Sequence, residues 1–99
     1  MQVFDSRTSK FVIIPRTLVT DQSVTYRDKA VYMAICLYAN NTTKAARPST
    51  QTIADNVGCN RNGVFESISR LETSGYVNRK TRRNKGGRKL SNVYYLLDK

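Results

Sequence analysis

Arg61 and Asn62 are neighbours in the sequence, and both side chains are of types that can form paired hydrogen bonds with nucleic-acid bases. A guanidinium can donate two parallel hydrogen bonds to guanine O6 and N7, and a carboxamide pairs in the same bidentate way with adenine. Glu66 can accept from a cytosine amino group or form an i, i+4 ion pair with Arg70, and both readings stay open. Phe65 can touch a thymine methyl or pack against protein. The predicted base contacts are Asn60, Arg61, Asn62, Phe65 and Glu66.

Seven basic side chains, four of them arginine, fall within residues 79–89. Edge strands often carry lysine merely to discourage aggregation, but this density exceeds that need and favours contact with phosphates and a minor groove. Backbone N–H groups that begin a helix at Ser49 and Thr50, and at Asn60, are also natural phosphate ligands. The residues predicted to contact the DNA backbone are Ser49, Thr50, Gln51, Arg70, Arg79, Lys80, Arg82, Arg83, Lys85, Arg88 and Lys89.

The formal charge of the 99-residue chain is +10, and it is unevenly placed. Residues 76–99 hold eight basic side chains and one acidic one, whereas residues 1–75 hold nine basic and six acidic. Such a field attracts a polyanion without specifying which one. The charge alone therefore leaves duplex DNA, single-stranded DNA and RNA open.

The composition gives little support for a catalytic site or a metal-binding site. The chain has no histidine, its two cysteines are isolated at Cys36 and Cys59, and its acidic residues are scattered. Both thiols lie in apolar surroundings and are expected to be buried and reduced. No phosphate-cradling loop accompanies Gly86 and Gly87. We expect a protein that is not an enzyme and that binds no metal or cofactor. Because the sequence shows neither a signal peptide nor a membrane-spanning stretch, we also expect a soluble cytoplasmic protein.

The elements that must position these residues follow from apolar periodicity and from capping and turn residues. Residues 1–10 are predicted to form a tail, and residues 11–99 one domain. Ser23 or Thr25 can cap the first helix, Ser49 or Thr50 the second, and Asn60 the third. The predicted order is a strand at 11–14, a polar connector at 17–23 that can include a helical turn around Leu18 and Val19, a helix to about 39, a loop at 40–48, a helix to about 57, a helix at 60–74, and a hairpin with strands 76–83 and 90–97 around a turn at 84–87.

The two helices within residues 51–71 are spaced as a helix-turn-helix. Ile53 and Ala54 face inward from the first of them, and Val64 and Ile68 from the second, while Gly58 supplies the left-handed exit between them. Helical hairpins of other kinds share this pattern, and the basic hairpin that follows makes it more specific. The sequence thus predicts an α+β fold of the winged helix-turn-helix type.

The whole pattern resembles the winged helix-turn-helix family found in plasmid and phage replication and regulatory proteins, and more distantly the DNA-binding domains of GntR and MarR regulators. The resemblance covers residues 11–97 and implies a recognition helix in the major groove with a wing on the backbone or in the minor groove. Phe65 and Gly63 depart from it. The residues that carry it are Phe11 to Pro15, Lys29, Tyr32, Pro48, Ser49, Ile53, Ala54, Val57 to Arg61, Val64, Ile68, Leu71, Gly75 to Val77 and Ser91 to Tyr94.

The first predicted helix is apolar all round from Ala30 to Ala39. Such a helix must be covered on both sides, by the domain core and by either the N-terminal strand or a partner subunit. We therefore expect a homodimer through this helix or the N-terminal segment. The sequence favours a duplex-DNA regulator or replication factor, with two rivals: a platform for RNA or single-stranded DNA, and a protein–protein adaptor using Phe65 and the first helix.

Overall fold

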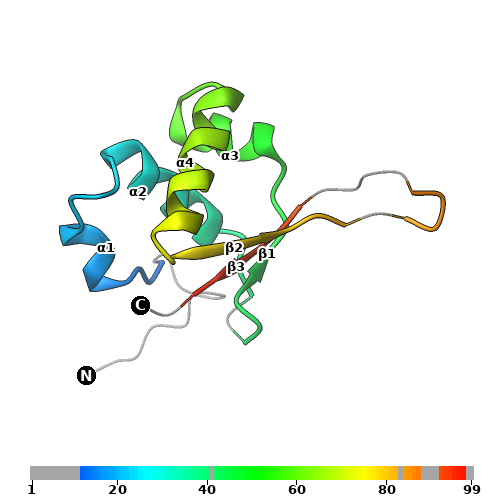
Figure 1. Ribbon diagram of the computed structural model, residues 1–99, viewed down its shortest axis with the longest axis horizontal. Coiled ribbons are helices and arrows are strands. Elements are labelled where there is room, and N and C mark those ends of the chain that lie inside the picture. The colour runs from blue at the N-terminus through cyan, green and yellow to red at the C-terminus, as the bar shows by residue number, and fades with distance from the viewer. Residues whose placement is uncertain (1–11, 41, 83, 88–91, 98–99) are drawn as a thin grey trace.

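The computed structural model describes residues 12–40, 42–82, 84–87 and 92–97. Its helices are α1 (Arg16–Thr20), α2 (Tyr26–Cys36), α3 (Thr50–Val57) and α4 (Arg61–Thr73), and its strands are β1 (Ala45–Ala46), β2 (Val77–Lys80) and β3 (Val93–Leu96). The strands form an antiparallel sheet in the order β1-β3-β2 (Figure 1). The fold is α+β of the winged helix-turn-helix type, which confirms the predicted class.

Side-chain caps fix the starts of the three long helices. Thr25 accepts from the Asp28 N–H at 3.1 Å, and Asp28 accepts from the Thr25 N–H at 2.9 Å, so α2 begins with a reciprocal capping box. Ser49 caps α3 by accepting from the Thr52 N–H, and Asn60 caps α4 by accepting from the Gly63 N–H. These caps confirm the predicted helix starts. Of the alternative caps that the sequence offered, Thr25 caps α2 and Ser49 caps α3.

The joint between α3 and α4 is a left-handed turn at Gly58, whose φ is 83°. The N–H groups of Gly58 and Cys59 both donate to the Ala54 carbonyl, at 2.8 and 3.1 Å. A residue with a Cβ adopts this conformation only with strain, so glycine permits the tight turn. The turn brings α4 across α3 at the predicted place.

One core lies between the helices and the inner face of the sheet. Tyr32 of α2 meets Tyr76 edge to face, with ring centroids 6.2 Å apart, and the Tyr76 hydroxyl donates to Asp21 at 2.7 Å. The fully buried side chains include Leu18, Val31, Ile35, Ile53, Val64, Ile68, Leu71 and Tyr94. The predicted inward stripe of α4 is therefore confirmed.

The N-terminal strand predicted at 11–14 is wrong where the structure describes it. Residues 12–14 form no strand, and Phe11 lies outside the described residues. The next residues, predicted as a connector that can include a helical turn around Leu18 and Val19, form α1, which begins directly after Pro15 and buries Leu18 completely. Proline suits the start of a helix, and the buried Leu18, together with a hydrogen bond of 3.0 Å from Lys29 Nζ to the Val19 carbonyl, holds this short helix on the core.

The third strand comes instead from the predicted loop at 40–48. Ala45 and Ala46 pair with Tyr95 and Tyr94 of β3. Lys44, with φ at 62°, turns the chain into this strand, and its carbonyl accepts from the Leu96 N–H at 2.9 Å. Two alanines have no β-propensity signal, so the strand is set by tertiary pairing.

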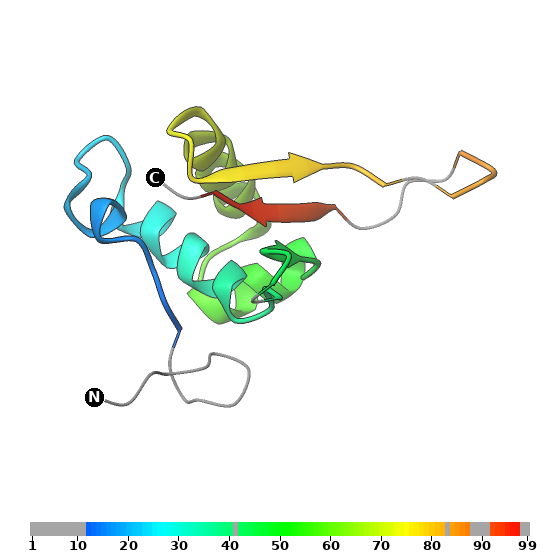
Figure 2. The same cartoon turned by 90° about the horizontal axis from the view of Figure 1, so that it is seen from below.

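Helix α2 ends at Cys36, three residues before the predicted end near Ala39. It packs against both α3 and α4, and lies between α1 and α3 in Figure 2. Most of its apolar side chains are covered within this one chain, while Tyr26 and Met33 stay exposed, as does Leu37 directly after its end. The domain core therefore buries most of the apolar side chains of α2.

The C-terminal hairpin extends away from the helices in both views (Figures 1 and 2). Its strands are shorter than predicted, at 77–80 and 93–96, and Leu90 and Ser91 lie outside the described residues. The predicted turn at 84–87 is present, because the Gly87 N–H donates to the Asn84 carbonyl at 3.0 Å. Within the described residues, the β2–β3 pairing runs from Val77 with Leu96 to Lys80 with Val93.

Candidate nucleic-acid interface

The solvent face of α4 carries four of the five predicted base contacts. Arg61, Asn62, Phe65 and Glu66 are exposed, while Val64 and Ile68 on the opposite face have no exposed surface. Phe65 keeps 39% of its surface exposed on a helix that is otherwise well packed. The first two turns of α4 therefore present one cation, one carboxamide, one carboxylate and one aromatic ring together.

The fifth predicted base contact, Asn60, serves the helix itself. Its Oδ1 accepts from the Gly63 N–H at 2.7 Å, which satisfies one of the donors left free at a helix start. This bond fixes the Asn60 side chain against the first turn of α4.

Glu66 and Arg70 each pair with α2, and not through the i, i+4 ion pair that the sequence left open. Arg27 of α2 donates to Glu66 at 2.9 Å, and Arg70 donates through Nε to Asp28 at 2.7 Å. Arg70, which was predicted to contact the DNA backbone, therefore uses its Nε–H for a hydrogen bond within the protein, although its side chain remains 40% exposed. Both partners lie about forty residues away in sequence, and a periodicity analysis does not detect such pairs.

Asp28 is a fully buried carboxylate. Burial alone would raise the pKa of its carboxyl, but hydrogen bonds from Arg70, Ser67 and Thr25 outweigh burial and hold the pKa below its ordinary value. The charged form is therefore built into the contact between α2 and α4. That contact sets how the exposed face of α4 is oriented on the domain.

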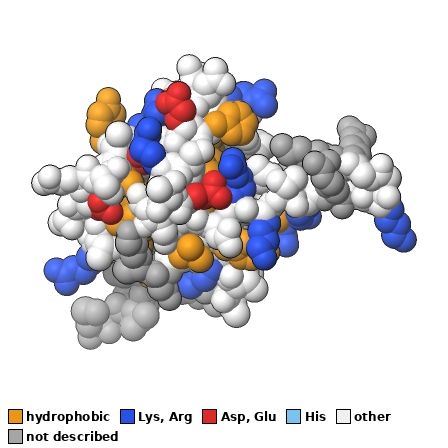
Figure 3. All heavy atoms as spheres, in the orientation of Figure 1, with side chains coloured by type: hydrophobic (Ala, Val, Ile, Leu, Met, Phe, Trp, Pro, Cys, Tyr) orange, Lys and Arg blue, Asp and Glu red, His pale blue; other side chains and the backbone are white. Residues whose placement is uncertain are grey.

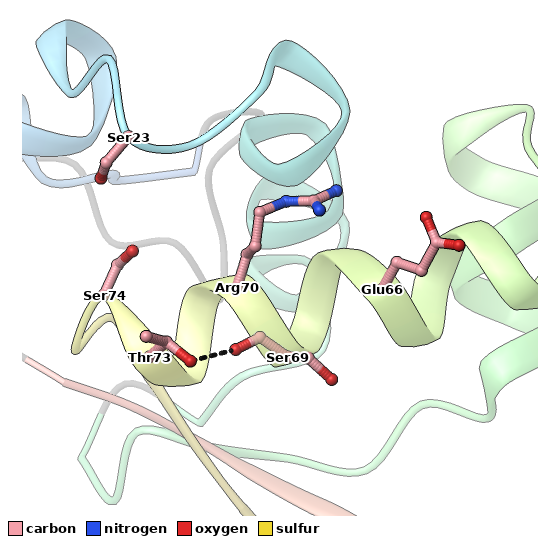
Figure 4. A pocket seen from close by; sticks show the side chains of 6 residues that line it. All are labelled: Ser23, Glu66, Ser69, Arg70, Thr73 and Ser74. Carbon is pink, nitrogen blue, oxygen red and sulfur yellow. Dashed lines mark hydrogen bonds between the residues drawn. The ribbon is translucent and has the colours of Figure 1, made fainter.

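A shallow groove runs along the contact of α4 with the chain that enters α2. Figure 4 shows Arg70 extending from α4 toward α2, with Glu66 about one turn away on the helix, and the Thr73 hydroxyl bonded to the Ser69 carbonyl at 3.0 Å. The groove is lined by Ser23, Glu66, Ser69, Arg70, Thr73 and Ser74. Hydroxyl groups, the Glu66 carboxylate and the ion-paired Arg70 supply the hydrogen-bonding groups of its lining.

The start of α3 carries the predicted contacts Ser49, Thr50 and Gln51. Ser49 is the cap and is exposed, and Gln51 donates to Asp55 at 2.9 Å on the surface. The sequence analysis overlooked Arg47, which is exposed immediately before the buried Pro48. A basic residue next to a capped helix start is the signal that could have identified it.

The hairpin bears a cationic edge free of acidic residues from 77 to 97. Figure 3 shows Lys and Arg side chains over the helices and along the hairpin out to its far end. Arg82 and Lys85 are exposed, whereas Arg79 pairs with Glu72 of α4 at 3.1 Å and Lys80 lies 5.6 Å from the centre of the Tyr95 ring. The predicted contacts Arg83, Arg88 and Lys89 lie outside the described residues.

The two tyrosines of β3 are poorly placed for stacking on bases. Tyr94 is buried in the core, and Tyr95 is half-buried beneath Lys80. A single-strand platform needs aromatic faces open to solvent beside its cations. On the described part of the hairpin, this requirement is not met.

The two cysteines differ in their surroundings. Cys36 is buried, and burial raises the pKa of its thiol to about 11. Cys59 is half-buried, so the prediction that both thiols are buried holds for Cys36 and is wrong for Cys59. Cys59 lies in the tight turn after Gly58, where it packs against the edge of the core and stays partly accessible. Within the described ranges, no group of residues forms a metal-binding cluster.

Comparison with known proteins agrees with this geometry. Residues 25–77 match the model of the helix-turn-helix domain family. A solved structure described as the N-terminal domain of a DNA-binding protein is similar with a TM-score of 0.63 and 18% identity, covering 99% of this chain and 84% of that one. A structure of a Rep–DNA complex gives a TM-score of 0.58 and 17% identity, with coverages of 98% and 83%.

No curated protein matches the chain. Among the residues that the structure describes, no helix is both long and apolar enough to cross a membrane.

Proposed function

Because the chain belongs to the helix-turn-helix domain family, we propose that it binds duplex DNA with sequence preference, without a chemical step. Helix α4 enters the major groove, and the hairpin lies along the backbone or in the adjacent minor groove. The observation that carries the proposal is the exposed face of Arg61, Asn62, Phe65 and Glu66 beside a hairpin without acidic residues. Base-reading groups and a source of phosphate contacts are thereby joined on one rigid core.

The biological setting we propose is a small transcription regulator, or an accessory or initiator factor in the replication or transfer of a plasmid or phage. Support comes from the fold shared with a protein solved as a Rep–DNA complex.

We further propose that two copies act together. Ile13 is 70% exposed and Leu37 is 59% exposed, next to the exposed Met33, although each belongs to an apolar stretch. A homodimer formed through α2 or the N-terminal segment would cover these side chains and place two recognition helices on a two-fold related site.

Competition binding tests the proposal. Fluorescence anisotropy with duplex DNA selected from a random pool, its separated strands and an RNA of the same sequence should rank the duplex first. Replacing Arg61 or Asn62 by alanine should cost about 1–3 kcal/mol on the selected duplex and much less on unrelated duplexes. Tighter binding to single strands or RNA would contradict the proposal.

The salt dependence separates the hairpin from α4. Arg82→Ala with Lys85→Ala removes two expected phosphate contacts, so the slope of log K against log salt should shrink by about 1.8, with the order of preferred sites unchanged. The charge-matched control is Arg16→Ala with Lys29→Ala, on α1 and α2. An equal loss of slope in the control would show that total charge, and not the hairpin, determines binding.

A further inference from the structure

Gly63 stands inside the first turns of α4, where a glycine weakens the helix by about 1 kcal/mol relative to alanine. The structure gives the reason. A Cβ at Gly63 would lie 3.2 Å from Arg27 Nη1 and 3.2 Å from Asn60 Oδ1, which is closer than side chains normally approach. The missing side chain therefore leaves a passage through which Arg27 of α2 crosses the start of α4.

Arg27 uses that passage to hold two consecutive residues of α4. Its Nε donates to the Ser67 hydroxyl at 3.0 Å, and its Nη2 donates to Glu66 Oε2 at 2.9 Å. Ser67 is completely buried, so the guanidinium is anchored on its inner side and offers its outer side to Glu66. The fork geometry of arginine allows both bonds at once, which a lysine ammonium would not reproduce in the same plane.

Glu66 is thereby fixed in direction without being buried. Its side chain is 63% exposed, and among the described residues its bond to Arg27 is made through Oε2, which leaves Oε1 as an acceptor on an exposed side chain. An unrestrained glutamate would sample several rotamers and would be repelled by nearby phosphates. The Arg27 charge offsets that repulsion and selects one orientation.

Resting on the proposed function, we propose that Arg27 is a specificity-determining residue that positions the Glu66 carboxylate to accept from the exocyclic amino group of a base. Cytosine N4 and adenine N6 are the major-groove donors of this kind. Arg27 acts through Glu66 and does not itself read the base. Gly63 takes part by keeping open the passage that Arg27 needs.

The test measures the protein's preference among bases at each base pair of the duplex. If Arg27 had a purely structural role, its replacement would not change the preference at one base pair alone. The duplex preferred by the wild-type protein is substituted one base pair at a time, and affinities are measured for Glu66→Ala, Arg27→Met and the double variant. Methionine keeps an unbranched apolar stem over Gly63 and removes the guanidinium. Circular dichroism selects a temperature at which every variant is folded. Arg16→Ala, on α1 at the opposite end from the hairpin, loses the same charge as a control (Figure 1).

We expect Glu66→Ala to lower the preference at one base pair about tenfold and Arg27→Met to lower it at least about threefold at the same base pair. The double variant should be no worse than Glu66→Ala alone, because both changes remove one contact. Arg16→Ala should weaken all duplexes alike.

Three results would overturn the inference: an Arg27→Met protein that keeps its base preference, one that weakens all duplexes equally, or a Glu66→Ala protein without any change in preference. A wild-type protein with no preference among duplexes would contradict the proposed function itself, and it is recognised before any variant is made.

Discussion

Replacing Asp28 by alanine tests how α4 is held on the domain. The carboxylate is fully buried and accepts from the Thr25 N–H at 2.9 Å and from Arg70 Nε at 2.7 Å. Loss of a hydrogen bond to a charged partner costs about 1.5–3 kcal/mol, and loss of the backbone bond in the capping box about 0.5–1.5 kcal/mol. The Arg70 side chain can turn to solvent, so no buried charge is left behind. We expect the free energy of unfolding to fall by about 3 kcal/mol.

For a domain of this size, that loss lowers the thermal midpoint by roughly 12–24 °C. The pH dependence provides a second measure. Because the folded pKa of Asp28 lies below its ordinary value, its stabilisation is fully present above pH about 3.8 and is lost as the pH falls through the folded pKa. The difference between wild type and Asp28→Ala should therefore be constant from about pH 5 to 8 and should narrow below about pH 4.

Urea denaturation followed by circular dichroism, at a series of pH values, measures both effects. Asp55→Ala is the matched control, because Asp55 is exposed on α3 and accepts from Gln51 at the surface. Such a surface change is expected to stay within about 0.5 kcal/mol. If Asp28→Ala destabilised no more than Asp55→Ala, or if its deficit persisted unchanged to pH 3, the role given to the buried carboxylate would be refuted.

Four further outcomes are expected. Gly63→Ala should stabilise the protein by less than the ~1 kcal/mol that helix propensity alone would give, because the new Cβ displaces Arg27; denaturant titration measures this, and the full gain would contradict the crowding. A thiol reagent at pH 8 should label Cys59 well before Cys36, whose pKa near 11 keeps it protonated, and equal rates would refute the assigned burial. Lys44→Gly should raise the thermal midpoint by about 2–4 °C, because a left-handed φ strains any residue with a Cβ, and a lower midpoint would show that this strain is absent. Sedimentation at micromolar concentration should give a dimer, and a monomer both free and on DNA would exclude the proposed pairing.

Local rules were sufficient for the parts of the fold whose residues carry strong individual preferences. Thr25, Ser49 and Asn60 start helices because their side-chain oxygens satisfy free N–H groups, and Gly58 ends one because it tolerates a positive φ. The exposed face of α4 followed from the same periodicity that placed Ile68 inside. These elements could be predicted within a few residues of their observed bounds.

Elements decided by distant partners could not be predicted in this way. Ala45 and Ala46 form a strand because β3 offers an edge for pairing, and α1 is held by the buried Leu18 and by Lys29 of α2, which donates to the Val19 carbonyl at 3.0 Å. The pairs Arg27–Glu66 and Asp28–Arg70 join positions about forty residues apart. No local pattern marks them, since nearby residues at helical spacing offered an equally reasonable partner for Glu66.

The position of β3 at the centre of the sheet has a consequence for the order of folding. β3 follows every other described element in the sequence, yet it pairs with β1 nearly fifty residues earlier and inserts Tyr94 into the core. The contacts of α3 with α2 and with α4 close short loops and can form early, whereas the β1–β3 pairing, like the contact of α2 with α4, closes a long loop at a greater entropic cost. During synthesis, α2, α3 and α4 can therefore associate before the sheet exists. The core is complete only when β3 has joined it.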